Sequence, residues 1–184
     1  LKKVEDLTVL VELAKESVTA SVRKAEVCGV STTGEVQFLR GGAMSAAAHV
    51  ASAGPDANAL LTCFGAEKTR MTGRYEASLQ VEGKGEAAQL PRALQGPLAF
   101  RASNGTMGKA SVITKILGVV NMTDVFGGKS GVRLGDALPF DEFTVEGQVE
   151  NGQVSIREAA LKSPSFTMAA SGSVGYLDES VDLM

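Results

Sequence analysis

The sequence predicts a mainly β fold with short helices, in which a curved antiparallel β-meander forms a groove and one amphipathic helix packs on its inner face. Apolar and polar residues alternate in several runs that turn-forming residues separate, as expected for strands with one apolar face. The composition is 44% hydrophobic but only 5% aromatic, with 21 glycines and no tryptophan. The apolar side chains are therefore mostly Val, Leu and Ala, which favours a thin sheet over a thick core.

The N-terminal part predicts a series of paired strands and one short helix. Residues 7–13 and 18–22 alternate on either side of Lys15 and Glu16, as the two strands of a hairpin do. Further strands are predicted within residues 25–39, with a turn at Thr33 and Gly34, and over residues 44–50. Residues 55–64 have Pro near their start and Gly just past their end, which is typical of a short helix.

The middle of the chain contains the longest alternating run. Residues 71–81 place apolar or small side chains on one face and polar side chains on the other, which predicts a strand. Residues 86–94 predict a short helix. Residues 98–102 predict another strand, which Asn104 and Gly105 close as a turn.

Between residues 109 and 122 the apolar spacing changes to that of an amphipathic helix. Its β-branched residues and Gly118 disfavour a helix, so burial against the sheet must hold it. We predict that its apolar side packs on the inner face as an end-cap of the groove. These apolar residues are Val112, Ile113, Ile116, Leu117 and Val120.

Three alternating runs predict a C-terminal meander. They cover residues 143–149, 154–156 and 166–176, and Asn151-Gly152 and Ser163-Pro164 separate them as turns. Because alternate residues of a strand share a face, the parity of each run predicts which side chains meet on the inner face. Those side chains are Tyr75, Leu79, Val81, Phe100, Phe143, Val145, Phe166, Met168 and Val174.

Composition and motifs argue against several classes of function. The net charge is −3 and the 18 Lys and Arg residues are dispersed, which excludes a nucleic-acid partner. His49 is the only histidine and has no partner pattern, so we expect no catalytic site, no metal and no cofactor. Gly83 and Gly85 precede the helix predicted over residues 86–94, but Pro91 and the lack of a βαβ unit favour a strand-to-helix turn over a dinucleotide site.

Cys28 and Cys63 are the only cysteines and lie 35 positions apart. This spacing excludes a CxxC redox or zinc motif. Two interpretations stay open from the residues alone: two buried free thiols, or one structural disulfide in an oxidising compartment.

Several segments together resemble the C-terminal region of the AsmA-like family, over roughly residues 25–184. The shared features are diffuse glycine and strand patterns, a leucine-rich helix over residues 113–121, and the closing strands over residues 145–176. None of these motifs is a catalytic signature. The other segments that carry the resemblance are residues 25–34, 60–63, 71–75, 94–100 and 104–106.

The resemblance implies a function and a compartment. AsmA-like proteins of Gram-negative bacteria are anchored in the inner membrane, extend through the periplasm as a long apolar β-groove, and are implicated in carrying phospholipid toward the outer membrane. By this resemblance, residues 1–184 are one domain of a longer protein, the inner-face side chains and those of the helix over residues 109–122 contact phospholipid acyl chains, and Cys28 and Cys63 form a disulfide. The membrane would be reached through regions outside this segment.

The competing interpretation is a β-rich scaffold that transfers nothing. Strand edges that are left unpaired recruit other strands, so a protein partner or a second copy could bind there. The sequence offers no catalytic constellation, and we therefore expect a non-enzymatic protein under either interpretation.

Overall fold

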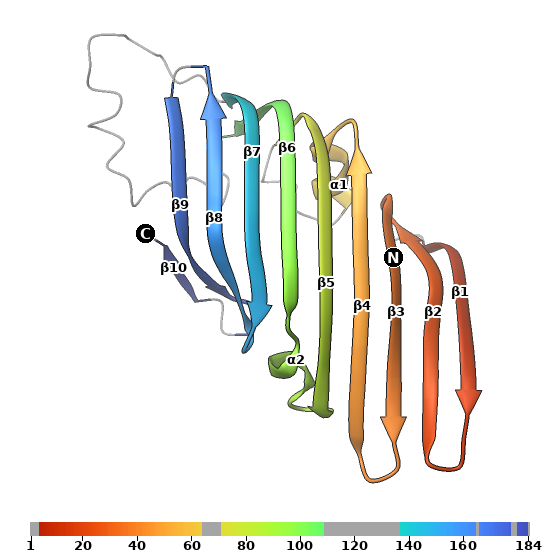
Figure 1. Ribbon diagram of the computed structural model, residues 1–184. Coiled ribbons are helices and arrows are strands. Elements are labelled where there is room, and N and C mark those ends of the chain that lie inside the picture. Colours follow the sequence, from red (N-terminus) through yellow and green to blue (C-terminus); the bar gives the residue numbers. More distant parts are fainter. Residues whose placement is uncertain (1–3, 64–70, 109–136, 165, 178–179, 184) are drawn as a thin grey trace.

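The computed structural model describes residues 4–63, 71–108, 137–164, 166–177 and 180–183. The described residues form one ten-stranded antiparallel sheet in which every strand pairs with the strand before it in the chain (Figure 1). Strands β1 and β10 lie at opposite edges, so the sheet is open. The strands are β1 (Val4–Leu13), β2 (Ser17–Val27), β3 (Val30–Leu39), β4 (Ala43–Gly54), β5 (Arg74–Glu86), β6 (Gly96–Gly108), β7 (Ala137–Glu150), β8 (Gln153–Ser163), β9 (Phe166–Gly175) and β10 (Val181–Leu183).

Two short helices accompany the sheet. Helix α1 (Ala57–Cys63) lies at one end of the strands beside β4 and β5, and α2 (Leu90–Ala93) lies at the opposite end beside β5 (Figure 1). The Oδ1 of Asp56 accepts the N–H of Asn58 at 3.0 Å, which caps the start of α1. The predicted mainly β meander is thus confirmed, as is the short helix before Gly65.

The turn between β7 and β8 follows the sequence prediction. Asn151 and Gly152 have φ of 52° and 80°. Left-handed backbone at both positions is what a type I′ two-residue hairpin turn requires, and Asn-Gly is the pair that adopts it most readily. This turn sets the register in which Val149 pairs with Val154.

The predicted turn at Thr33 and Gly34 is wrong. The chain reverses at Cys28 and Gly29 instead, with φ of 58° and 75°, and Gly34 lies inside β3 opposite Ala48. A Cβ on Gly34 would lie 2.7 Å from the carbonyl oxygen of Ala47. This glycine therefore allows close approach of β4 rather than a reversal.

Asn104 and Gly105 also do not end a strand. Asn104 has φ of 52°, yet β6 and β7 stay paired in one register on both sides of it, with Ser103 opposite Glu142 and Gly105 opposite Phe140. The distortion changes which side chains point inward. Phe140 and Phe143 belong to the same buried cluster although strict alternation would place them on opposite faces.

The helix predicted over residues 86–94 is much shorter than expected. Strand β5 continues to Glu86, so Gly83 and Gly85 are strand residues and not a strand-to-helix turn. The remaining helical segment is the single turn of α2, in which Pro91 occupies the first turn, where its missing N–H costs no hydrogen bond.

The amphipathic helix predicted over residues 109–122 lies outside the described residues. Its packing on the sheet therefore stays a prediction, as does the role of its apolar side chains. The residues concerned are Val112, Ile113, Ile116, Leu117 and Val120.

Candidate functional site

The register of the strands gathers the apolar side chains on one face of the sheet. Directly paired residues of an antiparallel sheet have their side chains on the same side. Residues that are paired from one strand to the next therefore form a row across one face of the sheet. One row runs from Tyr75 through Ala102, Phe143 and Leu161 to Met168. We call this side of the sheet the inner face.

The other rows continue the inner face across all the strands. Leu79 lies between Val50 and Leu98, and Phe100 lies between Ala77 and Val145. Val149, Val154, Val174 and Val181 form a row toward the C-terminal edge. Each β5–β9 side chain that the sequence placed on the inner face has this parity. The residues confirmed on this face are Tyr75, Leu79, Val81, Phe100, Phe143, Val145, Phe166, Met168 and Val174.

Helix α1 covers one end of the inner face with a buried core. The N–H of Ala57 donates to the carbonyl oxygen of Gly73 at 2.9 Å, and Leu60 and Leu61 pack against the cluster beneath the helix. This cluster contains most of the buried apolar residues among those that the structure describes. Its members are Ala57, Met71, Tyr75, Ala102, Met107, Phe140, Phe143 and Leu161.

Several of these core residues could not be found from sequence parity. Phe140, Met107 and Leu138 lie beyond the distortion at Asn104, where the alternation that identifies inner-face positions is interrupted. Leu161 and Ile156 lie on the same face of the sheet although one has an odd and the other an even number. The register shift between Ile156 and Ala159 causes this, and the sequence does not reveal the shift. The Asn-Gly pair at 104–105 is the one signal of that region, and it indicates a turn.

Helix α2 closes the opposite end of the inner face. A Cβ on Gly83 would lie 2.8 Å from the carbonyl oxygen of Ala93, so the helix backbone rests directly on β5 where the sheet has no side chain. The hydroxyl of Tyr176 donates to the carbonyl oxygen of Pro91 at 2.6 Å. Tyr176 directly follows β9, so this bond connects α2, which lies beside β5, to the C-terminal end of β9.

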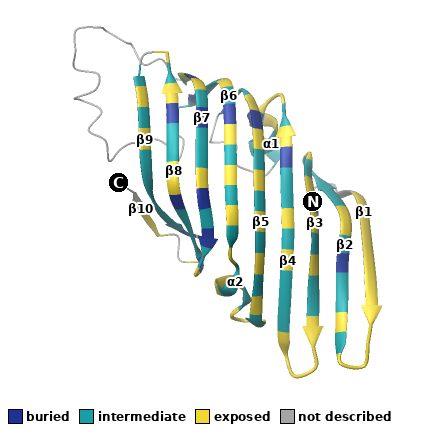
Figure 2. Ribbon diagram, viewed as in Figure 1, coloured by how far each residue is buried: buried dark blue, intermediate teal, exposed yellow. Residues whose placement is uncertain are grey.

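Between the two helices the inner face is only partly shielded from solvent. Leu79, Val81, Leu98, Phe100 and Val145 are all half-buried (Figure 2). Toward the N-terminal edge the face becomes open: Val11 is 56% exposed and Leu13 is 79% exposed. Large apolar side chains are therefore available to an apolar ligand or partner over several strands.

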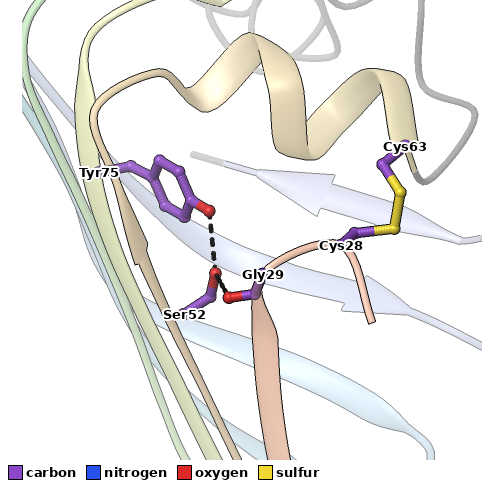
Figure 3. Close-up of a disulfide and its surroundings, with 5 residues drawn as sticks. All are labelled: Cys28, Gly29, Ser52, Cys63 and Tyr75. Carbon is purple, nitrogen blue, oxygen red and sulfur yellow. Dashed lines mark hydrogen bonds between the residues drawn. A yellow bond between two sulfur atoms is a disulfide. The ribbon is translucent and has the colours of Figure 1, made fainter. Parts of the chain in front are cut away.

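The disulfide between Cys28 and Cys63 connects α1 to the sheet (Figure 3). It joins the β2–β3 turn to the last residue of the helix, with the two Cα atoms 6.0 Å apart. The disulfide that the resemblance implied is thus present. Such bonds persist in oxidising, extracytoplasmic compartments.

A buried hydrogen-bond chain lies beside the disulfide. The hydroxyl of Ser52 lies 3.1 Å from the carbonyl oxygen of Gly29 and 2.9 Å from the hydroxyl of Tyr75. Because a carbonyl oxygen only accepts, Ser52 donates to Gly29 and Tyr75 donates to Ser52. This chain satisfies the only polar groups that Tyr75 and Ser52 bring into the core (Figure 3).

The opposite face of the sheet carries cross-strand ion pairs. Glu142 lies between two cations on neighbouring strands, Arg101 and Lys162, with its Oε2 accepting from Lys162 Nζ at 2.9 Å. The hydrogen bond and charge of Lys162, followed by the charge of Arg101, hold the pKa of Glu142 below its ordinary value of 4.5.

We expect this pairing to make the stability of the protein sensitive to acid. A carboxylate whose pKa is lower in the folded state stabilises the fold above its unfolded pKa and loses that contribution as the pH falls through the folded value. The melting temperature of Glu142→Gln should therefore lie below that of the wild type at pH 6 to 7 and approach it at about pH 3. Because the side chains of Arg101 and Lys162 are exposed, added salt should also narrow the difference in melting temperature. If the difference in melting temperature between the wild type and Glu142→Gln stays constant from pH 7 to pH 3, the ion pairing of Glu142 does not stabilise the fold as described.

The polar face also contains a shallow hollow of about 680 Å³. It is lined in part by Thr33, Glu35, His49, Gln80 and Gln148, and the His49 side chain is exposed there. Within the described ranges, no three His, Cys, Asp or Glu side chains are placed to hold a metal ion. No helix within those ranges is long and apolar enough to cross a membrane.

No protein-family model, curated protein or solved structure matches this chain. The candidate site therefore depends on the geometry of the chain itself. Its defining property is an open apolar face that two helices border at opposite strand ends.

Proposed function

We propose that this domain is non-catalytic and holds the acyl chains of a phospholipid on its inner face, as one segment of a lipid-transporting protein. The observation that supports the proposal is the continuous apolar face, which remains half-buried at its centre and exposed toward β1. Covering such a face with acyl chain contributes about 0.8 kcal/mol for each buried CH₂ group.

The cellular setting is part of the same proposal. The resemblance to the AsmA-like family implies the periplasm and an inner-membrane anchor, and the Cys28–Cys63 disulfide suits the oxidising conditions of that compartment. Phospholipid transfer toward the outer membrane would then use this domain as part of a longer apolar path.

The contact would be hydrophobic and without direction, which has two consequences. Selectivity among acyl chains should be loose, and no single apolar side chain should be indispensable. The polar side chains of the other face, such as Arg74, Glu76 and Gln80, would remain in water. The alternative is that the same face is an ordinary protein core, or that the domain is a scaffold that transfers nothing.

A charge placed on the inner face should block lipid contact. Leu79→Arg or Val145→Arg introduces a cation that an acyl chain would have to desolvate, so we expect loss of photo-crosslinking to a phospholipid with a diazirine on its acyl chain. Gln80→Arg is the matched control, because it adds the same charge one residue away on the polar face. Its crosslinking should equal that of the wild type.

Circular dichroism must first show that the variants are folded. If Leu79→Arg and Val145→Arg are folded and crosslink as efficiently as the wild type, the lipid proposal fails for this domain. The scaffold interpretation would then stand in its place.

A further inference from the structure

Among the described residues, no strand pairs with the outer edge of β1, and from Val9 to Leu13 this edge lacks the usual protection of an edge strand. From Val9, opposite Val22, to Leu13, opposite Val18, the pairing with β2 is regular, and the irregularities in this ladder are confined to the start of the strand. Proteins protect edges with lysine, proline or a bulge. Strand β1 contains neither Lys, Arg nor Pro, and Leu10, Val11 and Leu13 are all exposed.

The adjoining turn shows which backbone groups face the open edge. The N–H of Ala14 donates to the carbonyl oxygen of Ser17 at 2.9 Å, so this is a hydrogen-bonded pair. Hydrogen-bonded and non-hydrogen-bonded pairs alternate along an antiparallel ladder. The backbone groups of Val9, Val11 and Leu13 therefore point away from β2. The N–H of Arg40 donates to the carbonyl oxygen of Glu16 at 2.8 Å, which is consistent with the same alternation on the other side of β2.

We propose that β1 pairs with β1 of a second copy of this chain, antiparallel about a two-fold axis at Val11. In this register Val11 faces the partner's Val11, and Val9 faces the partner's Leu13. The pairing from β1 through to β5 places these side chains on the inner face, so the apolar faces of the two sheets become continuous. The inference does not depend on lipid binding, since it uses the edge of the sheet.

Self-pairing fits this edge better than pairing with the opposite edge does. Strand β10 has only three residues, so a head-to-tail contact between β1 and β10 would form a short ladder and would leave further edges open. A two-fold contact is closed after two copies. On the polar face, Glu12 lies opposite the partner's Leu10, so no two carboxylates of this region face each other directly.

Two acidic side chains near the ends of the contact already pair with cations within each copy. Lys24 Nζ lies 3.0 Å from Asp6 Oδ2, and Arg40 lies 3.3 Å from Glu16 Oε1. Glu12 and the partner's Glu12 are diagonal neighbours in this register, which weakens the dimer at low salt. Raising the ionic strength should therefore strengthen self-association.

Val11→Pro tests the edge without disturbing the hairpin. The N–H of Val11 makes no bond to β2, so proline removes only the hydrogen bond to the partner, and edge strands accept proline at such positions. Sedimentation equilibrium of the 184-residue chain should show a dimer of the wild type that dissociates on dilution. Val11→Pro should raise the dissociation constant by about tenfold or more, with an unchanged circular dichroism spectrum.

Single cysteine variants test the register. Val11→Cys should form a covalent dimer on oxidation, because directly paired Cα atoms lie about 5.5 Å apart. Val9→Cys is the matched control: the two copies of residue 9 would be about 13 Å apart along the strands and should not crosslink. Peptide mapping must show an intact Cys28–Cys63 bond in both variants.

Three results would overturn the proposal. The wild type could sediment as a monomer at every concentration, which would leave the edge to a different partner strand. Val11→Pro could leave dimerisation unchanged, or Val9→Cys could crosslink as readily as Val11→Cys, which would place the contact elsewhere or in another register.

Discussion

Removal of the Cys28–Cys63 disulfide should lower the free energy of unfolding by about 3 to 4 kcal/mol. The bond closes a loop of 35 positions and thereby restricts the unfolded chain. It also anchors α1, whose seven residues are too few to form a stable helix alone. Chemical denaturation of the double variant Cys28→Ser with Cys63→Ser, compared with the oxidised wild type, measures the loss.

Reduced wild-type protein is the control for this experiment. It should lose the same stability as the double variant, because both remove the bond while they keep side chains of similar size. A loss below about 1 kcal/mol in both would show that the bond does not constrain the unfolded chain as this explanation requires.

Phe140→Ala should destabilise the protein by about 3 to 5 kcal/mol, the range for removal of a buried aromatic side chain. Phe140 is 2% exposed and belongs to the cluster beneath α1. Its ring fits over a residue without a side chain: a Cβ on Gly105 would lie 2.6 Å from Phe140 Cζ. The surrounding strands have little freedom to move into the cavity that the substitution leaves. The loss in free energy of unfolding should therefore fall in this range.

Phe38→Ala is the matched control for Phe140→Ala. Phe38 lies on the same face of the sheet but is 47% exposed, so its removal should cost about 1 kcal/mol or less. Urea denaturation of both variants gives the two free energies. Equal losses would show that the centre of stability is not the cluster beneath α1.

The sequence predicts the faces of the strands better than their ends. Alternation from Tyr75 to Val81 follows directly from the pleat, because one side of the sheet must bury apolar groups and the other meets water. The same logic places Phe143, Val145 and Met168 correctly. These positions depend only on a local period, which the sequence carries in full.

Turns depend on contacts between distant residues, and there the prediction fails. Asn151-Gly152 is recognised because both residues favour left-handed backbone. Cys28 does not favour it, and its position in a turn is explained only by the hairpin and by its bond to Cys63. Gly34 and Gly105 are of a residue type that favours turns. In the structure, however, Gly34 allows a neighbouring strand to approach closely, and Gly105 allows the ring of Phe140 to do so.

In the candidate site, too, features that depend on local alternation are predicted and features that depend on distant contacts are not. Its apolar side chains could be assigned to one face from parity, whereas the two helices that border that face could not be positioned. Helix α2 rests on β5 because Gly83 leaves space for its backbone, and this is a packing relation that no periodicity records. The bond from Tyr176 to Pro91 spans 85 positions and is likewise invisible in the pattern.

The most direct test of lipid binding is to map where a phospholipid crosslinks to the folded wild-type chain. A phospholipid with an acyl-chain diazirine is irradiated with the protein, and the modified residues are identified by peptide mass spectrometry. We predict adducts on half-buried inner-face residues such as Leu79, Leu98 and Val145, and none on Glu76, Gln80 or Arg101 of the polar face. Adducts that are absent, or spread equally over both faces, would contradict the proposal that this sheet holds acyl chains.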